Sequence, residues 1–301
     1  MLWKKEWRWW IVVLSAIFLC ACSIDSHLYV QEAAVKIDDP FETETEQEFS
    51  GLIITYLALP HGESTLLRMP GGKTMLIDTG TAEDWPVLSA RLAELKITRL
   101  DYVVLTNDQP EHMGGYASLS QQVIVDAVIL PKLIASSLRH VVLLRSNQKQ
   151  MEAEQGQVLT LDQEISMEVL LPDEPLFLSP QNNSLVFRLT HRQLRFLFMS
   201  AVNEKAEERL LERQNDRLKA EVLKVAGQGS NQGSSQPFLT QVDPQVAIIQ
   251  TGRSRDQMKD GQTEVMERLG ESWAETYVTS HDGSITILSN GKEYRILKQK
   301  N

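Results

Sequence analysis

The sequence contains few cysteines: among its 301 residues only Cys20 and Cys22 carry a thiol, and both lie close to the N-terminus. The rest of the chain therefore cannot form a disulfide bond or a metal site with thiolate ligands. A Gly-x-Ser-x-Gly segment is also missing, which excludes the serine nucleophile of an α/β-hydrolase. The Gly- and Ser-rich segment 227–235 is not followed by a Lys-Ser or Lys-Thr pair, so it does not match a phosphate-binding loop.

A cluster of basic residues is missing as well. The chain has 30 Lys and Arg against 40 Asp and Glu, which gives a net charge of −10. The basic residues of segment 204–217 alternate with acidic ones, as on a solvated helix face. A negative surface without a basic groove repels phosphate backbones, and nucleic acid is therefore not an expected partner.

The first residues are typical of an exported bacterial protein. Three basic residues precede an apolar run at 9–19, which is shorter than a membrane-spanning helix and matches the core of a signal peptide. The next residues, Leu-Cys-Ala-Cys at 19–22, resemble a bacterial lipobox, and Cys22 fits the acylated position better than Cys20 because a small residue precedes it. We expect residues 1–21 to be a lipoprotein signal peptide and lipidated Cys22 to hold an extracytoplasmic protein at the bacterial membrane. A short N-terminal transmembrane anchor is the alternative.

Residues 22–50 are expected to form an acidic disordered tether. Between Ser23 and Ser50 there are eight acidic residues and a single basic one, Lys36, with few bulky apolar residues. Such a composition cannot bury enough surface to fold alone. Cleavage before Cys22 would remove three basic residues and one acidic residue, so the net charge would become −12. Residues 51–301 would then form one domain, because no second break of linker size follows.

Short apolar runs rich in β-branched residues, bounded by Gly, Pro or Asp, predict strands in this domain. The runs are 52–59, 64–69, 74–77, 102–105, 127–130, 165–171, 184–189, 194–199, 246–249, 276–278, 284–288 and 294–297. Apolar residues with helical spacing occur at 87–95, 206–211 and 266–273, and the weakly amphipathic segment 133–144 is expected to be a core-facing helix or strand. Two sheets covered by helices on their outer faces would use this pattern.

Several segments, in order along the chain, resemble the landmarks of a known family. They are 58–64, the hairpin turn at 69–73, 76–80, the loop at 105–115, the strand pair around 182–201, 223–230, 242–248 and 279–285. Together they resemble a metallo-β-lactamase-fold domain of the ComEC competence type. The resemblance covers nearly all of residues 51–297 and implies an α/β fold of the αββα sandwich kind.

The same resemblance implies that most of the family's metal ligands are replaced. The positions of its His-x-His/Asp-x-Asp-His loop, its bridging carboxylate and its two later histidines are held here by Asn107, Gln109, Glu111, His112, Ala201, Gly227 and Gln228. A metal pair needs imidazoles and carboxylates, whereas amide oxygens are weak zinc ligands and alanine cannot bind a metal. Asp78, Glu111 and His112 are the ligands that remain. We therefore expect no bound metal cofactor.

These remaining residues allow two interpretations. Asp78 could accept backbone hydrogen bonds in a turn, and His112 could be a packed residue of a helix that begins near Pro110. Alternatively, a new mononuclear site for zinc or manganese could form from His61, Glu63, Glu111 and His112.

Three functions fit the sequence. The first is a binding protein that uses the former active-site cleft, lined by Asn107, Gln109, Ser200 and Gln228, as a neutral polar surface. The second is a metal-dependent hydrolase of the phosphodiesterase or nuclease class, which the resemblance implies. The third is an accessory subunit with a protein partner in the cell envelope or in a DNA-uptake machine. Because most ligands are replaced, we expect a binding or accessory protein without hydrolase activity.

Overall fold

The computed structural model describes residues 49–141, 148–253 and 260–299. The expected signal peptide, Cys22 and almost all of the expected tether lie outside the described residues. Within those three ranges, no helix combines the length and the apolar character that crossing a membrane requires. The first strand begins at Leu52.

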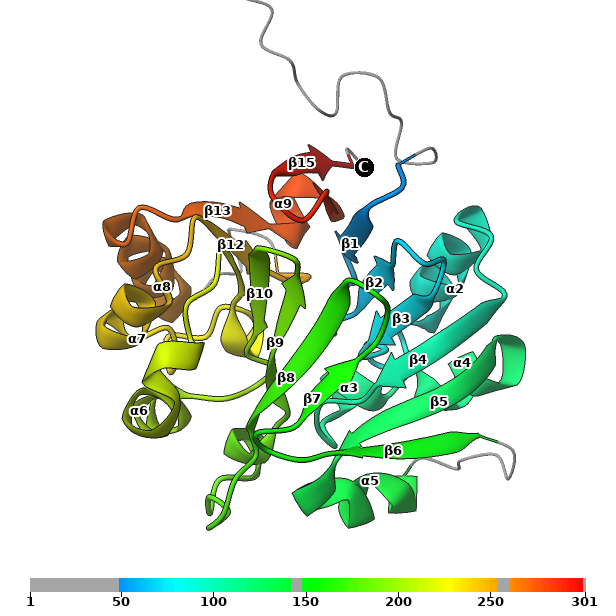
Figure 1. Cartoon of the computed structure of the whole chain (residues 1–301), viewed down its shortest axis with the longest axis horizontal. Coiled ribbons are helices and arrows are strands. Elements are labelled where there is room, and N and C mark those ends of the chain that lie inside the picture. The colour runs from blue at the N-terminus through cyan, green and yellow to red at the C-terminus, as the bar shows by residue number, and fades with distance from the viewer. Residues whose placement is uncertain (1–48, 142–147, 254–259, 300–301) are drawn as a thin grey trace, which may run out of the picture. The chain divides into compact units, whose positions relative to one another are not determined.

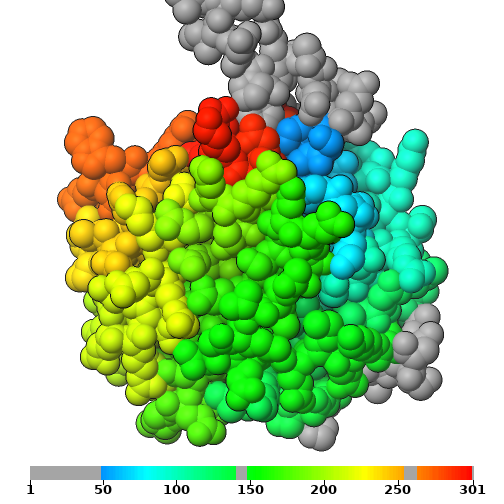
Figure 2. Space-filling model, in the orientation of Figure 1, coloured from blue at the N-terminus to red at the C-terminus, as the bar shows by residue number. Residues whose placement is uncertain are grey.

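Two sheets form the centre of the described domain (Figure 1). The first sheet has eight strands, in the order β15 (Tyr294–Lys298), β14 (Ile285–Ser289), β1 (Leu52–Tyr56), β2 (Thr65–Arg68), β3 (Thr74–Ile77), β4 (Arg99–Val104), β5 (Ile124–Pro131) and β6 (Lys149–Ala153). The second has seven strands, in the order β13 (Glu275–Val278), β12 (Val246–Ile249), β11 (Val222–Lys224), β10 (Leu194–Phe198), β9 (Val186–His191), β8 (Ile165–Leu171) and β7 (Val158–Thr160). In Figure 2, the side chains of the green segments, which include β7 and β8, form the middle of the face shown.

Helices cover the outer face of each sheet (Figure 1). The first sheet carries α2 (Trp85–Glu94), α4 (Tyr116–Gln122) and α5 (Ala135–Val141), and the second carries α6 (Glu204–Gln214), α7 (Gln236–Val242) and α8 (Asp260–Glu271). Two shorter helices are α3 (Pro110–Met113) and α9 (Thr279–Asp282), and single 3-10 turns lie at Lys132–Ile134, Pro180–Asn183, Asn215–Arg217 and Ala226–Gln228. The expected αββα sandwich is confirmed.

The alternation of side chains along the strands explains these layers. In β10, Phe196 and Phe198 point into the core between the sheets, whereas Leu197 packs under the helices of the second sheet. The Phe198 ring stacks on Phe187 at 4.9 Å and lies 6.1 Å from the ring of Tyr56 in the opposite sheet. Strands that are covered on both faces are therefore apolar at consecutive positions, which is why their runs stand out in the sequence.

Some predicted elements differ from the structure. Segment 133–144 forms the end of a 3-10 turn and then helix α5, as far as it is described. Trp273 lies beyond the end of α8 and is 93% exposed, so the prediction that it belongs to the apolar face of that helix was wrong. The strands β6, β7 and β11 were not predicted.

Parallel pairing brings the polar ends of several strands to one edge of the sandwich. β3 pairs with β4 in the first sheet, and β10, β11 and β12 are neighbours in the second, all in parallel. Asp78 and Thr106 follow β3 and β4, Ser200 follows β10, and Lys224 ends β11. The candidate site is built from these residues.

Candidate functional site

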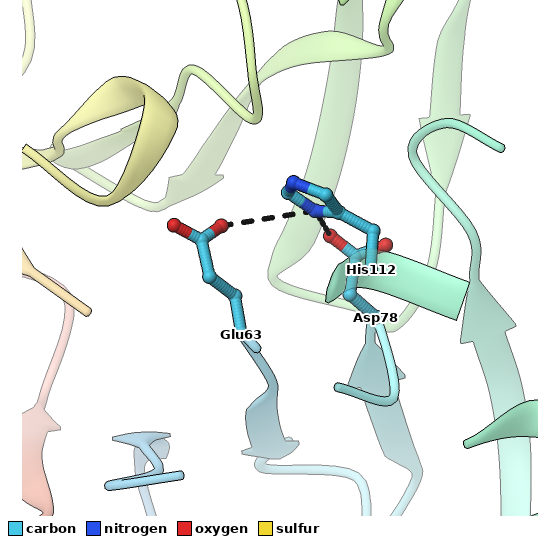
Figure 3. A group of neighbouring side chains, drawn as sticks. All are labelled: Glu63, Asp78 and His112. Atoms are coloured by element: carbon cyan, nitrogen blue, oxygen red, sulfur yellow. Dashed lines mark hydrogen bonds and ion pairs between the residues drawn. The ribbon is translucent and has the colours of Figure 1, made fainter. Parts of the chain in front are cut away.

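Three potential metal ligands lie together where these strands end. Glu63, Asp78 and His112 each offer one oxygen or nitrogen atom, and these atoms all lie within 4.8 Å of one another. Their side chains point toward a common centre (Figure 3). Glu63 is 2%, Asp78 3% and His112 2% exposed. The cluster is therefore buried in the protein interior. Charges interact more strongly there than in water.

Asp78 uses both of its carboxylate oxygens within the protein. Thr106 donates its N–H to Oδ1 and its hydroxyl to Oδ2, each at 2.8 Å. The Nδ1 atom of His112 lies 2.7 Å from the same Oδ2. Asp78 has φ of 58°, in the left-handed region that Asp tolerates better than most residues, so the chain turns sharply as β3 ends. The turn aims the carboxylate at its two partners.

His112 comes from the short helix α3. Burial lowers the pKa of His112, but the charge and the hydrogen bond of Asp78, together with the charge of Glu63, outweigh this effect and raise the pKa above its usual value. The positive charge of Lys224 opposes that rise in part. Nδ1 faces the carboxylate of Asp78, and the other ring nitrogen points away from both carboxylates (Figure 3).

A lysine lies in the middle of this group of acids. The Lys224 ammonium forms a short ion pair with Oε2 of Glu63, and this same oxygen lies 3.7 Å from Nδ1 of His112. Lys224 is 4% exposed. Lys224 therefore supplies a positive charge directly beside Glu63 inside the buried cluster.

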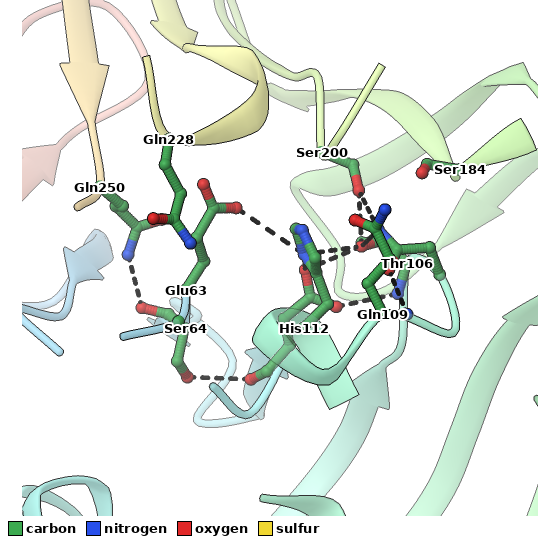
Figure 4. A network of polar contacts seen from close by, with 12 residues as sticks. Glu63, Ser64, Thr106, Gln109, His112, Ser184, Ser200, Gln228 and Gln250 are labelled. Atoms are coloured by element: carbon green, nitrogen blue, oxygen red, sulfur yellow. Dashed lines mark hydrogen bonds and ion pairs between the residues drawn. The ribbon is translucent and has the colours of Figure 1, made fainter. Parts of the chain in front are cut away.

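Uncharged groups extend the network toward the second sheet (Figure 4). Ser200 donates its hydroxyl to Oγ1 of Thr106 at 2.7 Å, and Nδ2 of Asn107 donates to Oγ of Ser200 at 3.0 Å. The Oδ1 atom of Asn107 accepts the N–H of Gln109 at 2.8 Å. Hydroxyl and amide groups of both sheets are thus bonded to one another and to Asp78.

Several potential ligand atoms of the cluster are already bonded to protein groups. Lys224 already binds the nearest oxygen of Glu63, and its positive charge would repel a second cation at that point. Both oxygens of Asp78 accept hydrogen bonds from Thr106, and Oδ2 is also hydrogen-bonded to Nδ1 of His112. A small cavity of about 10 Å³, lined by Glu63, Asp78, Thr106, Ser200 and Lys224 among others, has room for about one water molecule.

The structure separates the residues that were predicted to form a mononuclear site. Glu63 and His112 meet, with Asp78 as the third member of the cluster, whereas His61 and Glu111 are exposed and do not belong to it. The backbone of Glu111 still supports the site, because its carbonyl accepts the N–H of Glu63 at 2.9 Å.

The neutral residues of the predicted cleft behave differently from one another. Asn107 and Ser200 are buried and bonded to each other, so they are not free to bind a ligand. Gln109 is half-buried, and Gln228 donates its side-chain amide to the carbonyl of His61 at 3.0 Å. Ala201 and Gly227, which the sequence resemblance aligns with two ligand positions of the family, are also half-buried. Residue 201 offers only a methyl group, and residue 227 has no side chain.

Sequence reasoning missed Lys224 and Thr106 as site residues. Lys224 lies within the segment 223–230 that carries the family resemblance, but a lysine at a strand end is usually exposed. The signal that could have found it is its place in an apolar run, directly between Leu223 and Val225, which are both buried.

A sandwich of two sheets between helices, with an acid and histidine cluster at the strand ends, defines the class of metallo-β-lactamase-fold proteins. Residues 60–292 match the family described as the Metallo-beta-lactamase superfamily, and the chain belongs to this family. The chain is also similar to ComE operon protein 3 of Bacillus subtilis (strain 168), with 25% identity over 222 residues. The match covers 67% of this chain and 28% of that protein, so the chain spans less than a third of its relative. The resemblance to a ComEC-type domain is confirmed.

Solved structures show the same fold. The metallo-beta-lactamase fold protein YhfI from Bacillus subtilis superposes with a TM-score of 0.53 at 13% identity, over 75% of this chain and 96% of YhfI. CmlA, a diiron β-hydroxylase from Streptomyces venezuelae, gives a TM-score of 0.51 at 12% identity, over 83% of this chain and 54% of CmlA. At this level of identity the likeness concerns the fold and not the activity.

Proposed function

We propose that this protein is a non-catalytic member of the metallo-β-lactamase superfamily that acts as a binding or accessory protein. The observation that supports this proposal best is the ion pair of Lys224 with Glu63 inside the residual site. In metal-dependent hydrolysis, a bound metal ion polarises the substrate or lowers the pKa of a water molecule. Here a lysine supplies the positive charge beside the acids, and an ammonium group offers no open coordination position.

The alternative is a hydrolase with a mononuclear metal site, of the phosphodiesterase or nuclease class. It is favoured by one observation, the placement of Glu63, Asp78 and His112 with their ligand atoms within 4.8 Å of one another. For such a site to form, Lys224 would have to leave Glu63, and the buried ammonium would need a new partner. This rearrangement is costly because an unpaired buried charge is strongly destabilising.

Metal content distinguishes the non-catalytic binding protein from the metal-dependent hydrolase. The full chain, purified without a chelating tag, should hold less than about a tenth of an equivalent of zinc or manganese after incubation with either metal, measured by elemental mass spectrometry. The variants H112A and H281A form a matched pair, because His281 is an exposed histidine outside the cluster. About one equivalent in the wild type and in H281A, but not in H112A, would establish a metal site and overturn the proposal.

We further propose that acylated Cys22 anchors the protein to the bacterial membrane on its outer side, where it would meet an envelope partner. The sequence supports this with its short apolar run and the lipobox-like residues 19–22. Labelling with a radioactive fatty acid in a bacterial host tests it. Label should enter the wild type and C20S but not C22S. Equal labelling of both variants would contradict Cys22 as the lipidated residue.

A further inference from the structure

A second site of a different kind lies beside helix α2. A cleft of about 470 Å³ opens between this helix, the end of β1 and the start of β14, and it is lined by Leu57, Leu59, Pro86, Val87, Arg91 and Ser284 among others. This volume falls within the range of small-molecule sites. None of the side chains of the buried charge cluster lines it. The cleft is therefore independent of the residual metal site and of the function proposed for it.

The walls of the cleft are mostly apolar. Leu57 and Leu59, which follow β1, are buried at its base, and Pro86 and Val87 of α2 are exposed at its side. Val87 is one of the large apolar side chains that remain exposed among the described residues. An apolar ligand body would cover this surface and remove it from water.

Two of the lining residues, Arg91 and Ser284, carry hydrogen-bond donors. Arg91 is largely buried, with 14% of its side chain exposed, and its Nη1 atom pairs with Glu94 at 2.5 Å. Its buried Nε donates to no other group that the structure describes. Ser284 accepts the N–H of Ala58 at 3.1 Å, which leaves its own hydroxyl hydrogen available to donate.

We propose that this cleft binds a small carboxylate with an apolar body, such as a medium-chain fatty acid. The carboxylate would accept from Arg91 and from Ser284, and the chain would lie against Leu57, Leu59 and Val87. Glu94 is 60% exposed, so it can turn into solvent and yield its place on the guanidinium to the ligand. A ligand with a positive head would meet Arg91 with the wrong charge.

The test uses octanoate and octylammonium, which share an apolar chain and differ in the charge of the head. Titration calorimetry on the purified full chain should give saturable binding of octanoate with a dissociation constant of about 1 mM, as expected for a ligand of this size. Octylammonium should not bind at the same concentrations. In R91A the octanoate affinity should fall about tenfold or more, whereas R91K should retain part of it.

Two further variants make the result specific. A90W places a large ring in the cleft from an exposed position of α2 and should abolish octanoate binding. R99A removes an exposed arginine paired with Asp126 outside the cleft and should leave the affinity unchanged. The thermal unfolding midpoint of each variant shows that it is folded. No saturable octanoate binding by about 10 mM would overturn the proposal. Equal binding of octylammonium, or binding that survives both R91A and A90W, would overturn it as well.

Discussion

Replacing Lys224 with methionine should destabilise the fold strongly, although it removes only one ammonium group. Methionine fills nearly the same volume as the lysine stem, so little of the effect comes from packing. The effect comes from Glu63, which is 2% exposed and would keep only His112 as a charged neighbour, at 3.7 Å. Its Oε1 atom has no hydrogen-bond partner among the described residues even in the wild type. Breaking a buried pair in this way costs about 3–5 kcal/mol.

Urea unfolding, followed by circular dichroism, measures this loss. The midpoint of K224M should fall by about 1 M or more, at the slopes usual for a domain of this size. The double variant K224M/E63Q should recover at least about 2 kcal/mol of the sum of the two single losses, because it leaves neither charge unpaired. The matched control is K132M, which breaks an exposed pair with Glu154 and should leave the urea midpoint nearly unchanged. A shift in K224M as small as that in K132M, or additive losses in the double variant, would refute this reasoning.

Three further predictions follow from the site. Because the pKa of His112 is raised, its stabilising contribution is fully present below the ordinary value of 6.5 and is lost as the pH rises through the higher value of the folded state. The free energy of unfolding should therefore fall as the pH rises above 6.5 in the wild type and much less in H112Q, and parallel curves would contradict this. Chelation should not change stability, so the thermal midpoint with and without EDTA should agree within about 2 °C, and a larger drop would show a structural metal. Asp84 is buried and accepts the N–H groups of His61, Gly62 and Thr81 as well as the Thr81 hydroxyl. D84A should therefore lose about 3 kcal/mol or more in urea unfolding, whereas a loss below about 1 kcal/mol would show that these donors find other partners.

The fold was predictable because its central strands are covered on both faces. The bounds of β3, β8 and β12 agree with the predicted runs, since each is apolar over its whole length or alternates clearly. In the missed strands this signal is weak or very short, and only β11 among them is buried along its whole length. β6 is a largely exposed edge strand with the sequence KQMEA, and β7 and β11 have three residues each. Their pairing is decided by neighbouring strands and not by their own residues.

The candidate site was predictable only in part. Asp78 and His112 stand in recognisable motifs, and the sequence offered Glu63 as a possible ligand. The ion pair between Glu63 and Lys224 joins residues 161 positions apart, one from each sheet, and no local pattern announces it. His61 and Glu111 were grouped with the others because they are near in sequence, but side chains of neighbouring residues in a loop need not point the same way. The contacts that raise the pKa of His112 could be seen only in the folded structure.

The lysine within the acid cluster also limits how this sequence can change over generations. A replacement at position 63, 78, 112 or 224 alone leaves an opposite charge buried without its partner, and the fold carries that cost at once. A change at Lys224 would therefore have to be accompanied by a change at Glu63 to keep the fold stable. Because selection removes destabilised single variants, positions 63 and 224 should change together or not at all.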